Sequence, residues 1–423
     1  MLGDTINEYL YYGYAKKNPI TLWDGTLNSE DNFELDYTPD GASKKLDHIF
    51  DDVFSKIKLD GYCIIPLSGG WDSRVMLGSA LNRLPTCQIK TVSFGCPKQL
   101  DYELGYKLAN SVGVEHHRVD LSKIQVNWLS LISSTRNSPW TYALDAFFNS
   151  FSISSVSNEK DTILSGFMGD PLTGGHTSPS TTKHEAIAEF QAKQKFSKRE
   201  NISPSLYNPS EGLEHLVPPK EIKYIDYLDY GIRQANCIAP ILGFKKFWAG
   251  WGDYYSQHCM TKANFLTPFT HKAWANYWLK ASDNCKKDQK LYKEMINTNF
   301  PKLVEIGSKD TFGIPHQKKM NIKIQQTISR GKKKAHRYFP CKLTRENSML
   351  NYVDFSTFFR IRNDYQEILY QAVDILDKNC IAPWVNFEKI IDLHMKRKED
   401  NYQSILLIIG LALNIECLSK NNH

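Results

Sequence analysis

The sequence predicts an α/β protein: a parallel sheet with helices on both faces, followed by a mostly helical C-terminal region. Two observations predict the first part. Short apolar runs alternate with residues at helical spacing as far as residue 176, and the runs end in turns that contain Ser or Gly. A third observation predicts the second part, because helical and aromatic segments continue beyond about residue 223 without further strand-like runs.

Each element follows from its own pattern. Apolar residues at helical spacing predict a helix over 41–58, with Ser43 as its N-cap. The expected strands are the apolar runs 62–67, 89–94, 114–121 and 162–165. The expected helices are 72–82, 102–112, a stretch around 142–151, 225–235, 244–255, 271–280, 289–299, 355–376 and 405–417.

Four segments organise the chain. Residues 1–40 are rich in Tyr, Asn and Asp, and we expect them to form an N-terminal arm on the surface. Residues 41–176 form the α/β core. Residues 177–222 are polar and contain several prolines, which indicates an excursion or linker. Residues 223–423 form the helical region.

The composition is that of a globular protein: 423 residues, 41% of them hydrophobic, with a net charge of +6. This mild charge suits anionic small molecules and does not require nucleic acid. The nine cysteines include no C-x-x-C pair, which favours reduced thiols. Met1–Thr5 is unlike a secretory signal, and the apolar run Ile405–Leu413 is far short of the roughly 20 residues of a membrane helix. We therefore expect a cytoplasmic protein with no membrane partner.

The most informative stretch is Ser68–Ser73, which reads Ser-Gly-Gly-Trp-Asp-Ser and lies between a predicted strand and a predicted helix. Successive N–H groups of such a turn, together with the positive end of the helix, bind an anion. Gly69 and Gly70 let the backbone approach phosphate without an intervening Cβ, and Asp72 adds a carboxylate suited to Mg²⁺. The spacing matches neither the dinucleotide fingerprint nor the Walker loop, and it suits a compact anion such as the pyrophosphate of ATP.

A second Gly-rich stretch, Ser165–His176, follows the strand 162–165 and contains Asp170. Taken alone, a Gly-rich loop with one acid is equally well explained by turn chemistry. In a parallel sheet, however, ligands bind beyond the carboxyl ends of the strands, where this stretch and Ser68–Ser73 both lie. We therefore expect Asp72 and Asp170 to hold one Mg²⁺ from opposite sides.

These motifs carry a resemblance to a known family. Pro66–Arg74 resembles the Ser-Gly-Gly-x-Asp-Ser pyrophosphate loop of the asparagine synthetase family, within the ATP pyrophosphatase (PP-loop) superfamily. Thr91–Gly95 and Asp101–His116 resemble that family's second strand and helix, and Ser165–His176 resembles its Ser-Gly-Glu-Gly-Ala-Asp-Glu-Leu-Phe-Gly-Gly-Tyr signature. Leu266–Phe269 is weakly similar to a downstream part.

The resemblance covers roughly residues 45–420, and it implies an adenine nucleotide alpha hydrolase-like fold. Residues 41–176 would be the ATP pyrophosphatase-type core, and 223–423 would complete the synthetase domain and its acceptor pocket. The implied activity uses ATP and Mg²⁺ to adenylate a carboxylate, with release of pyrophosphate, and then forms an amide with ammonia or an amine.

The resemblance also implies roles for residues. Asp72 and Asp170 would be the Mg²⁺ ligands and catalytic residues. The family has a late lysine that faces the reacting phosphate, and Lys333 and Lys334 are the candidates for it, although a solvated basic loop explains that tract equally well. The implied ATP and pyrophosphate residues are Leu67, Ser68, Gly69, Gly70, Asp72, Ser73, Ser93, Gly95 and Gly166.

Three departures from the family pattern bear on the substrate. Phe167 and Pro171 stand where the signature has glutamate, and Arg74 replaces a small residue. We therefore expect a small-molecule or peptide carboxylate other than plain aspartate. Residue 2 is Leu2 instead of a catalytic cysteine, so we expect no glutaminase domain; ammonia or an amine would come from solution or from a separate glutaminase.

Two other interpretations remain open. A PP-loop enzyme that modifies tRNA would use the basic tract Lys318–Arg345 as its footprint, although the absence of a C-x-x-C pair makes a nucleic-acid partner the weaker hypothesis. Phe167 and Pro171 also suit a degenerate member that binds nucleotide without catalysis. The two acids Asp72 and Asp170 argue against this second alternative.

Overall fold

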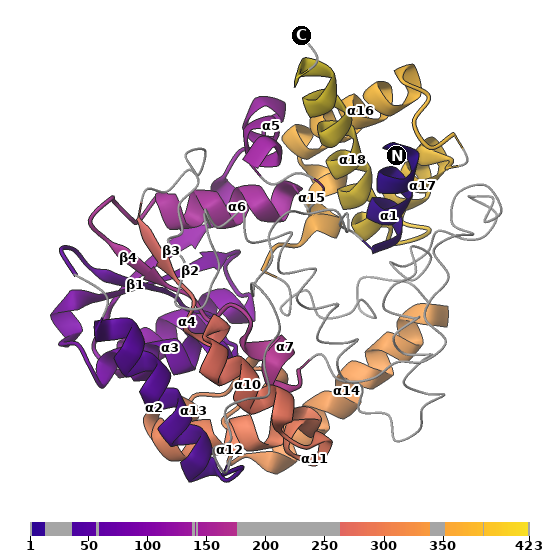
Figure 1. Cartoon of the computed structure of the whole chain (residues 1–423). Coiled ribbons are helices and arrows are strands. Elements are labelled where there is room, and N and C mark those ends of the chain that lie inside the picture. The colour runs from indigo at the N-terminus through magenta and orange to yellow at the C-terminus, as the bar shows by residue number, and fades with distance from the viewer. Residues whose placement is uncertain are drawn as a thin grey trace.

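The computed structural model describes residues 2–12, 36–55, 59–137, 140, 143–175, 263–338, 352–383 and 385–421. The predicted polar segment 177–222 and the predicted helices 225–235 and 244–255 lie outside these residues. Two hydrophobic clusters organise the described part of the chain, one around a parallel sheet and one within a helical bundle (Figure 1).

The sheet has five parallel strands in the order β3-β2-β1-β4-β5. The predicted α/β fold class is confirmed, and so are the four predicted strands. The fifth strand was not predicted, because its three residues are too few to show an alternating pattern. The strands are β1 (Cys63–Pro66), β2 (Ile89–Gly95), β3 (Glu115–Asp120), β4 (Thr162–Leu164) and β5 (Asn264–Leu266).

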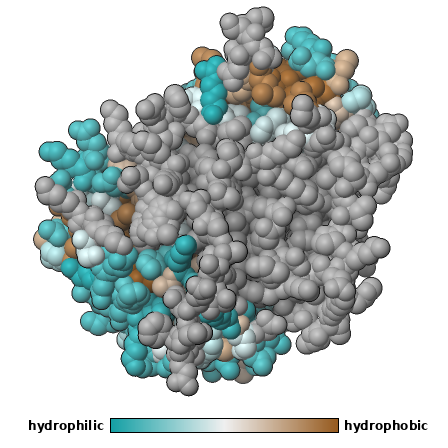
Figure 2. All heavy atoms as spheres, in the orientation of Figure 1, coloured by the Kyte–Doolittle hydropathy of each residue, from teal (hydrophilic) through white to brown (hydrophobic). Residues whose placement is uncertain are grey.

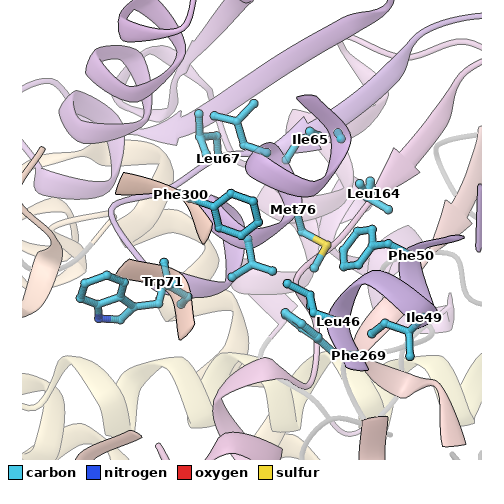
Figure 3. Packing of buried hydrophobic residues seen from close by; sticks show 14 of the residues in the cluster. Leu46, Ile49, Phe50, Ile65, Leu67, Trp71, Met76, Leu164, Phe269 and Phe300 are labelled. Carbon is cyan, nitrogen blue, oxygen red and sulfur yellow. The ribbon is translucent and has the colours of Figure 1, made fainter. Parts of the chain in front are cut away.

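Helices cover both faces of the sheet. Figure 1 shows α3 (Trp71–Leu81) and α4 (Leu100–Ser111) on one side and α6 (Ala143–Ser154) on the other. Figure 3 shows how side chains from α2 (Pro39–Ser55), α3 and β1 meet around the buried Met76. A Cβ on Gly78 would lie 2.3 Å from the ring of Phe300, so glycine at this position lets α3 approach that ring closely.

The remaining helices near the sheet follow β4 and β5. The helices that follow β4 and β5 are α7 (Gly169–Thr173), α10 (Lys272–Lys280), α11 (Asp283–Lys286), α12 (Lys290–Asn299), α13 (Pro301–Val304) and α14 (Lys319–Tyr338). Two of them, α10 and α12, agree with the predicted helices 271–280 and 289–299. Short 3-10 helices are η1 (Thr86–Gln88), η2 (Leu121–Lys123), η6 (Pro268–Thr270), η7 (Lys287–Gln289) and η8 (Lys309–Thr311).

The second cluster is a bundle built around the long apolar helix α18, with α6 shared between bundle and sheet. Within the described residues, Tyr402–Ser419 of α18 is the one segment long and apolar enough to span a membrane, yet 72% of it is buried in the fold, as in a core helix. In Figure 2, hydrophobic atoms on the visible face gather over this bundle. Helix α18 runs over Tyr402–Asn421. The other helices of the bundle are α1 (Leu2–Tyr12), α5 (Trp128–Asn137), α15 (Phe355–Ile361), α16 (Asn363–Lys378) and α17 (Phe387–Met395).

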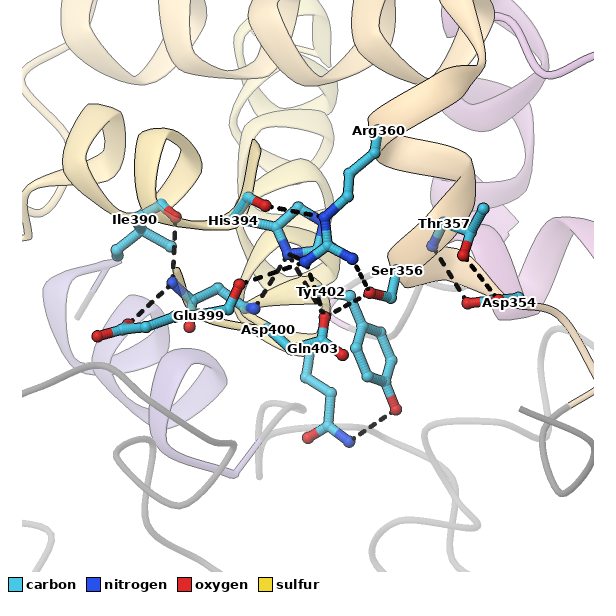
Figure 4. A network of polar contacts seen from close by, with 11 residues as sticks. Asp354, Ser356, Thr357, Arg360, Ile390, His394, Glu399, Asp400, Tyr402 and Gln403 are labelled. Carbon is cyan, nitrogen blue, oxygen red and sulfur yellow. Dashed lines mark hydrogen bonds and ion pairs between the residues drawn. The ribbon is translucent and has the colours of Figure 1, made fainter. Parts of the chain in front are cut away.

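A partly buried network of polar contacts connects the ends of helices in this bundle (Figure 4). The guanidinium of Arg360 in α15 donates 2.8 Å to the carbonyl oxygen of His394 in α17 and 2.7 Å to Ser356 Oγ. Ser356 in turn donates to Asp400, and the backbone N–H of Asn401 donates 3.1 Å to His394 Nδ1. These contacts join α15, α17 and the start of α18, so we assign the network a structural role.

The structure corrects three expectations. The predicted helix 355–376 is two helices, because Arg362 adopts an extended conformation between them and pairs with Asp364 at 2.7 Å. Ser43 is not an N-cap, since α2 begins earlier, at Pro39, and Ser43 donates to the carbonyl oxygen of Pro39 inside the helix. The start of the N-terminal arm is not only a surface feature: Tyr9 in α1 is fully buried in the bundle.

Candidate functional site

The Ser68–Ser73 loop leaves the carboxyl end of β1 and enters α3 at Trp71. Its own serines shape it: Ser73 Oγ accepts 3.2 Å from the N–H of Ser68, and Ser68 Oγ accepts 3.2 Å from the N–H of Gly70. The N–H of Leu67 still donates 2.8 Å to the carbonyl oxygen of Val92. The loop is therefore anchored to the sheet at its start and held in shape by its own hydrogen bonds.

The neighbouring strand β2 and helix α4 pack against the loop and support it. Ser93 at the end of β2 is buried and donates 2.6 Å to the carbonyl oxygen of Leu67. A Cβ on Gly105 in α4 would lie 1.9 Å from Ser93 Oγ, so only glycine lets α4 lie this close. The N–H of Gly69 donates 3.2 Å to Asp101 Oδ1, so the loop is also joined to α4.

Asp72, in the first turn of α3, lies at the centre of the site. Its Oδ1 accepts 2.8 Å from the hydroxyl of Tyr292 in α12, and its Oδ2 accepts 3.0 Å from the N–H of Asp170 in α7. Burial and then the negative charge of Asp170 raise the pKa of the Asp72 carboxyl well above its usual range, while the two hydrogen bonds act in the opposite direction. The 165–175 stretch and the loop therefore meet, as their places in the sequence predicted.

Two glycines make this meeting possible. A Cβ on Gly166 would lie 2.8 Å from Asp72 Cβ, and a Cβ on Gly169 would lie 2.2 Å from Asp72 Cγ. Any larger residue at these positions would push the Asp72 carboxylate away. Gly166 and Gly169 thus give backbone the space to approach Asp72 directly.

The Asp170 side chain is exposed, and its Oδ1 accepts 3.0 Å from Gln289 Nε2. Mg²⁺ prefers carboxylate oxygens as ligands, and Asp72 and Asp170 offer two neighbouring carboxylates. A cation between them would favour the charged form of Asp72 and so oppose the effects of burial and of Asp170, which raise its pKa. The residues therefore fit a Mg²⁺ that arrives with phosphate oxygens. Within the described ranges, no group of three or more His, Cys, Asp or Glu side chains forms a metal cluster.

Sequence reasoning missed a lysine that lies against the loop. The backbone N–H of Lys309 donates 3.0 Å to the carbonyl oxygen of Gly69, and its Nζ lies 2.7 Å from Asp101 Oδ2. Asp101 therefore links the Lys309 ammonium to the N–H of Gly69. The only sequence signal is local: Lys309 follows a Gly-Ser pair just after the helical segment that ends near residue 304.

The predicted lysines, Lys333 and Lys334, belong to α14, which extends away from the sheet in Figure 1. The tract is helical as far as Tyr338, and the neighbouring Lys332 is exposed, so the expectation of a loop is wrong for this part. The positions of the Lys333 and Lys334 side chains are outside the description, and their catalytic role stays a prediction.

Phe167 and Pro171, which stand where the family signature has glutamate, have local structural explanations. Phe167 is half-buried and packs against the hydrophobic cluster of the sheet. Pro171 lies in the first turn of α7, where a missing N–H costs no helical hydrogen bond. Gly95, at the end of β2, has φ +152° and faces the carbonyl oxygen of Tyr352.

Arg74 is fully buried, one turn into α3. Its guanidinium donates to backbone carbonyl oxygens of Leu303 at 2.5 Å, Ile306 at 2.6 Å and Gly307 at 2.8 Å. Burial lowers its pKa to about 10, which still leaves the group charged at neutral pH. The segment that precedes Lys309 is thus held directly against the helix of the loop.

The sequence of the chain is distantly similar to that of a known enzyme. No protein-family model matches the chain. The chain is 26% identical over 240 residues to "Asparagine synthetase [glutamine-hydrolyzing]" of Mesocricetus auratus. The aligned region is 52% of this chain and spans 41% of the length of that enzyme.

Proposed function

We propose that the chain is an ATP-dependent ligase that adenylates a carboxylate, releases pyrophosphate and joins the acyl group to ammonia or an amine. The observation that carries this proposal is the convergence of two distant segments, represented by Asp170 and Lys309, on the loop that contains Asp72. The distant similarity to an asparagine synthetase supports the same reaction class.

The first chemical step is attack of a carboxylate oxygen on the α-phosphorus of ATP. The bond between that phosphorus and its bridging oxygen to the β-phosphorus breaks, and pyrophosphate leaves with the electron pair. The N–H groups at the N-terminus of α3, which the Ser68–Ser73 loop presents to the site, would stabilise the charge on the leaving group. Lys309, freed from Asp101, would add a positive charge at the same place.

Mg²⁺ held by Asp72 and Asp170 would neutralise charge on the phosphate chain. The preformed hydrogen bonds around Asp72 keep its carboxylate in place, which lowers the cost of ordering the site. In the second step, the nitrogen of ammonia or an amine attacks the acyl carbon of the adenylate, and AMP leaves. The amide product then carries the former nucleophile.

The carboxylate substrate that we propose is not plain aspartate. Neither Phe167 nor Pro171 offers a charge to an acceptor, whereas the family signature has glutamate at both positions. An apolar Phe167, packed against the sheet, favours an acceptor with fewer charges near that point. The nitrogen donor is ammonia, from solution or from a separate glutaminase, or an amine.

The test is a product assay with the full chain. The protein is incubated with ATP, Mg²⁺, a panel of carboxylates and either ammonium or simple amines, and phosphorus NMR follows the nucleotides. We expect AMP and pyrophosphate; formation of ADP and phosphate would contradict the proposal. ATP binding with no turnover on a broad panel would instead favour a nucleotide-binding protein without catalysis.

Asp72→Asn tests the site in the same assay. We expect loss of AMP formation with an unchanged circular dichroism spectrum, because the amide keeps the shape but cannot supply a charged metal ligand. Asp374→Asn, on the exposed surface of α16, is the matched control and should behave as the unchanged protein. Full activity of Asp72→Asn would remove its proposed role.

A further inference from the structure

We propose that Arg74 is a positioning residue that sets Lys309 against the Ser68–Ser73 loop, and this inference rests on the proposed function. Arg74 itself touches no phosphate in the scheme above. It acts through the chain segment 303–309, which it fixes to the loop's own helix.

The contacts of Arg74 join two separate pieces of backbone. Besides the carbonyl oxygens of residues 303, 306 and 307, the guanidinium donates 3.3 Å to the carbonyl oxygen of Gly70 and 3.4 Å to that of Gly69. One side chain therefore bridges the phosphate loop and a segment more than 220 positions later in the sequence. Leu303 is the first and Gly307 the last residue of that segment that Arg74 contacts.

Lys309 follows the last of these contacts by two residues. Its backbone N–H donates to the carbonyl oxygen of Gly69, the same oxygen that Arg74 reaches, so both residues converge on one peptide group. A second residue of α3 holds the next position: Trp71 Nε1 donates 3.0 Å to Asp310 Oδ2. Arg74 and Trp71 lie one turn apart on α3 and hold the segment on both sides of Lys309, Arg74 through backbone carbonyl oxygens and Trp71 through the Asp310 side chain.

The guanidinium is suited to this task in a way that other cations are not. Its five N–H donors lie in one plane, and carbonyl oxygens from two segments surround it. Among the described residues, Arg74 forms no ion pair with a carboxylate at salt-bridge distance. Burial of a cation is costly, and here the compensating partners are backbone groups whose positions it fixes.

The experiment is a double-mutant cycle between Arg74 and Lys309, read by calorimetric titration with magnesium pyrophosphate. We expect Arg74→Met and Lys309→Met each to weaken binding roughly tenfold, the usual effect of losing one charge-assisted contact. The double variant should bind about as weakly as Lys309→Met alone, because Arg74 acts through Lys309. Arg83→Met, in a partly buried arginine of another region that pairs with the exposed Asp47 and Asp51, is the control and should bind as the unchanged protein does.

The possible outcomes separate this inference from the proposed function. Normal binding by Arg74→Met, or a double variant weakened by the product of the two single effects, would overturn the positioning role while the product assay still stands. A wild-type chain that binds neither magnesium pyrophosphate nor MgATP would overturn the proposed function and this inference with it.

Because Arg74 is buried, Arg74→Met is paired with Arg74→Lys, which keeps the charge but cannot span both segments. We expect Arg74→Lys to weaken binding several-fold and to show the same non-additivity with Lys309→Met. Wild-type affinity in Arg74→Lys would contradict the need for a bridging guanidinium. Hydrogen exchange of residues 303–313 in the unchanged protein gives a readout without substitution: added magnesium pyrophosphate should slow it, and unchanged exchange would argue against a coupled segment.

Discussion

The hydroxyl of Tyr292 donates a hydrogen bond of 2.8 Å to Oδ1 of Asp72, across 220 positions of sequence. Tyr292 is fully buried among the rings of Phe269, Trp274 and Trp278, so packing fixes its hydroxyl. The aromatic core of the sheet thereby orients the carboxylate on which the proposed Mg²⁺ site depends.

Tyr292→Phe should therefore weaken binding of MgATP roughly tenfold while leaving the fold intact. The ring keeps its packing, and only the hydrogen bond to a charged group is lost, a loss of about 1.5–3 kcal/mol. Isothermal titration gives the affinity, and thermal melting checks the fold. Tyr370→Phe, an exposed tyrosine of α16, is the control; equal affinities in all three proteins would show that Asp72 needs no such support.

Gly169→Ala should abolish MgATP binding at this site, because its new methyl group would overlap the Asp72 carboxylate. The matched control is Gly331→Ala in α14, where a Cβ meets no atom within 4 Å. That control should bind normally and gain about 0.5–1 kcal/mol of stability, since alanine is the better helix former. Normal binding by Gly169→Ala would place the nucleotide away from Asp72.

The identity of the phosphate-facing lysine is open to a direct comparison. Lys309→Met should lower the rate of AMP formation at least a hundredfold, in keeping with loss of one preorganised charge in the transition state. The paired substitution Lys333→Met and Lys334→Met should leave most of that rate. The reverse order of effects would restore the prediction made for α14 and remove Lys309 from the site.

Asp145 makes stability depend on pH. This α6 residue is partly buried and accepts a hydrogen bond from the hydroxyl of Tyr352, and desolvation raises its pKa from 3.8 to about 7. Unfolding between these pH values releases a proton, so the free energy of unfolding should fall as pH rises from about 4 to about 7, by up to about 4 kcal/mol, and then level off.

Asp145→Asn should remove this dependence and keep the contact to Tyr352. Urea unfolding at pH 5 and pH 8 measures it: the variant should gain stability relative to the unchanged chain at the higher pH. Asp392→Asn, an exposed acid paired with Lys396, is the control. An unchanged pH slope in Asp145→Asn would show that Asp145 ionises normally in the folded chain.

Local patterns predicted the fold well where they were long or chemically distinctive. The Ser68–Ser73 loop, its flanking strand and helix, and its meeting with Asp170 follow from spacing and from the rule that parallel strands end at one edge. The break at Arg362 was hidden, because the apolar period continues through it and only side-chain bonds to residues 122, 124 and 364 reveal it.

The rest of the candidate site was not accessible from sequence. Tyr292, Lys309 and three of the bonding partners of Arg74 come from segments more than 200 positions away from the loop. A lysine that reaches the Ser68–Ser73 loop only through folding looks the same in sequence as a surface lysine. The basic run in α14 attracted attention because charge density is visible in a sequence, whereas proximity is not.

The strand order places β3 at one margin of the described sheet and the three-residue β5 at the other. An open margin is a template on which a foreign strand can pair and start aggregation. β3 carries Glu115 and Arg118, which pair with Lys90 of β2 and Glu103 of α4, so charged groups lie on this marginal strand, while β5 is too short to offer much pairing. The charge on β3 and the shortness of β5 are thus features that discourage strand pairing at the margins of the described sheet.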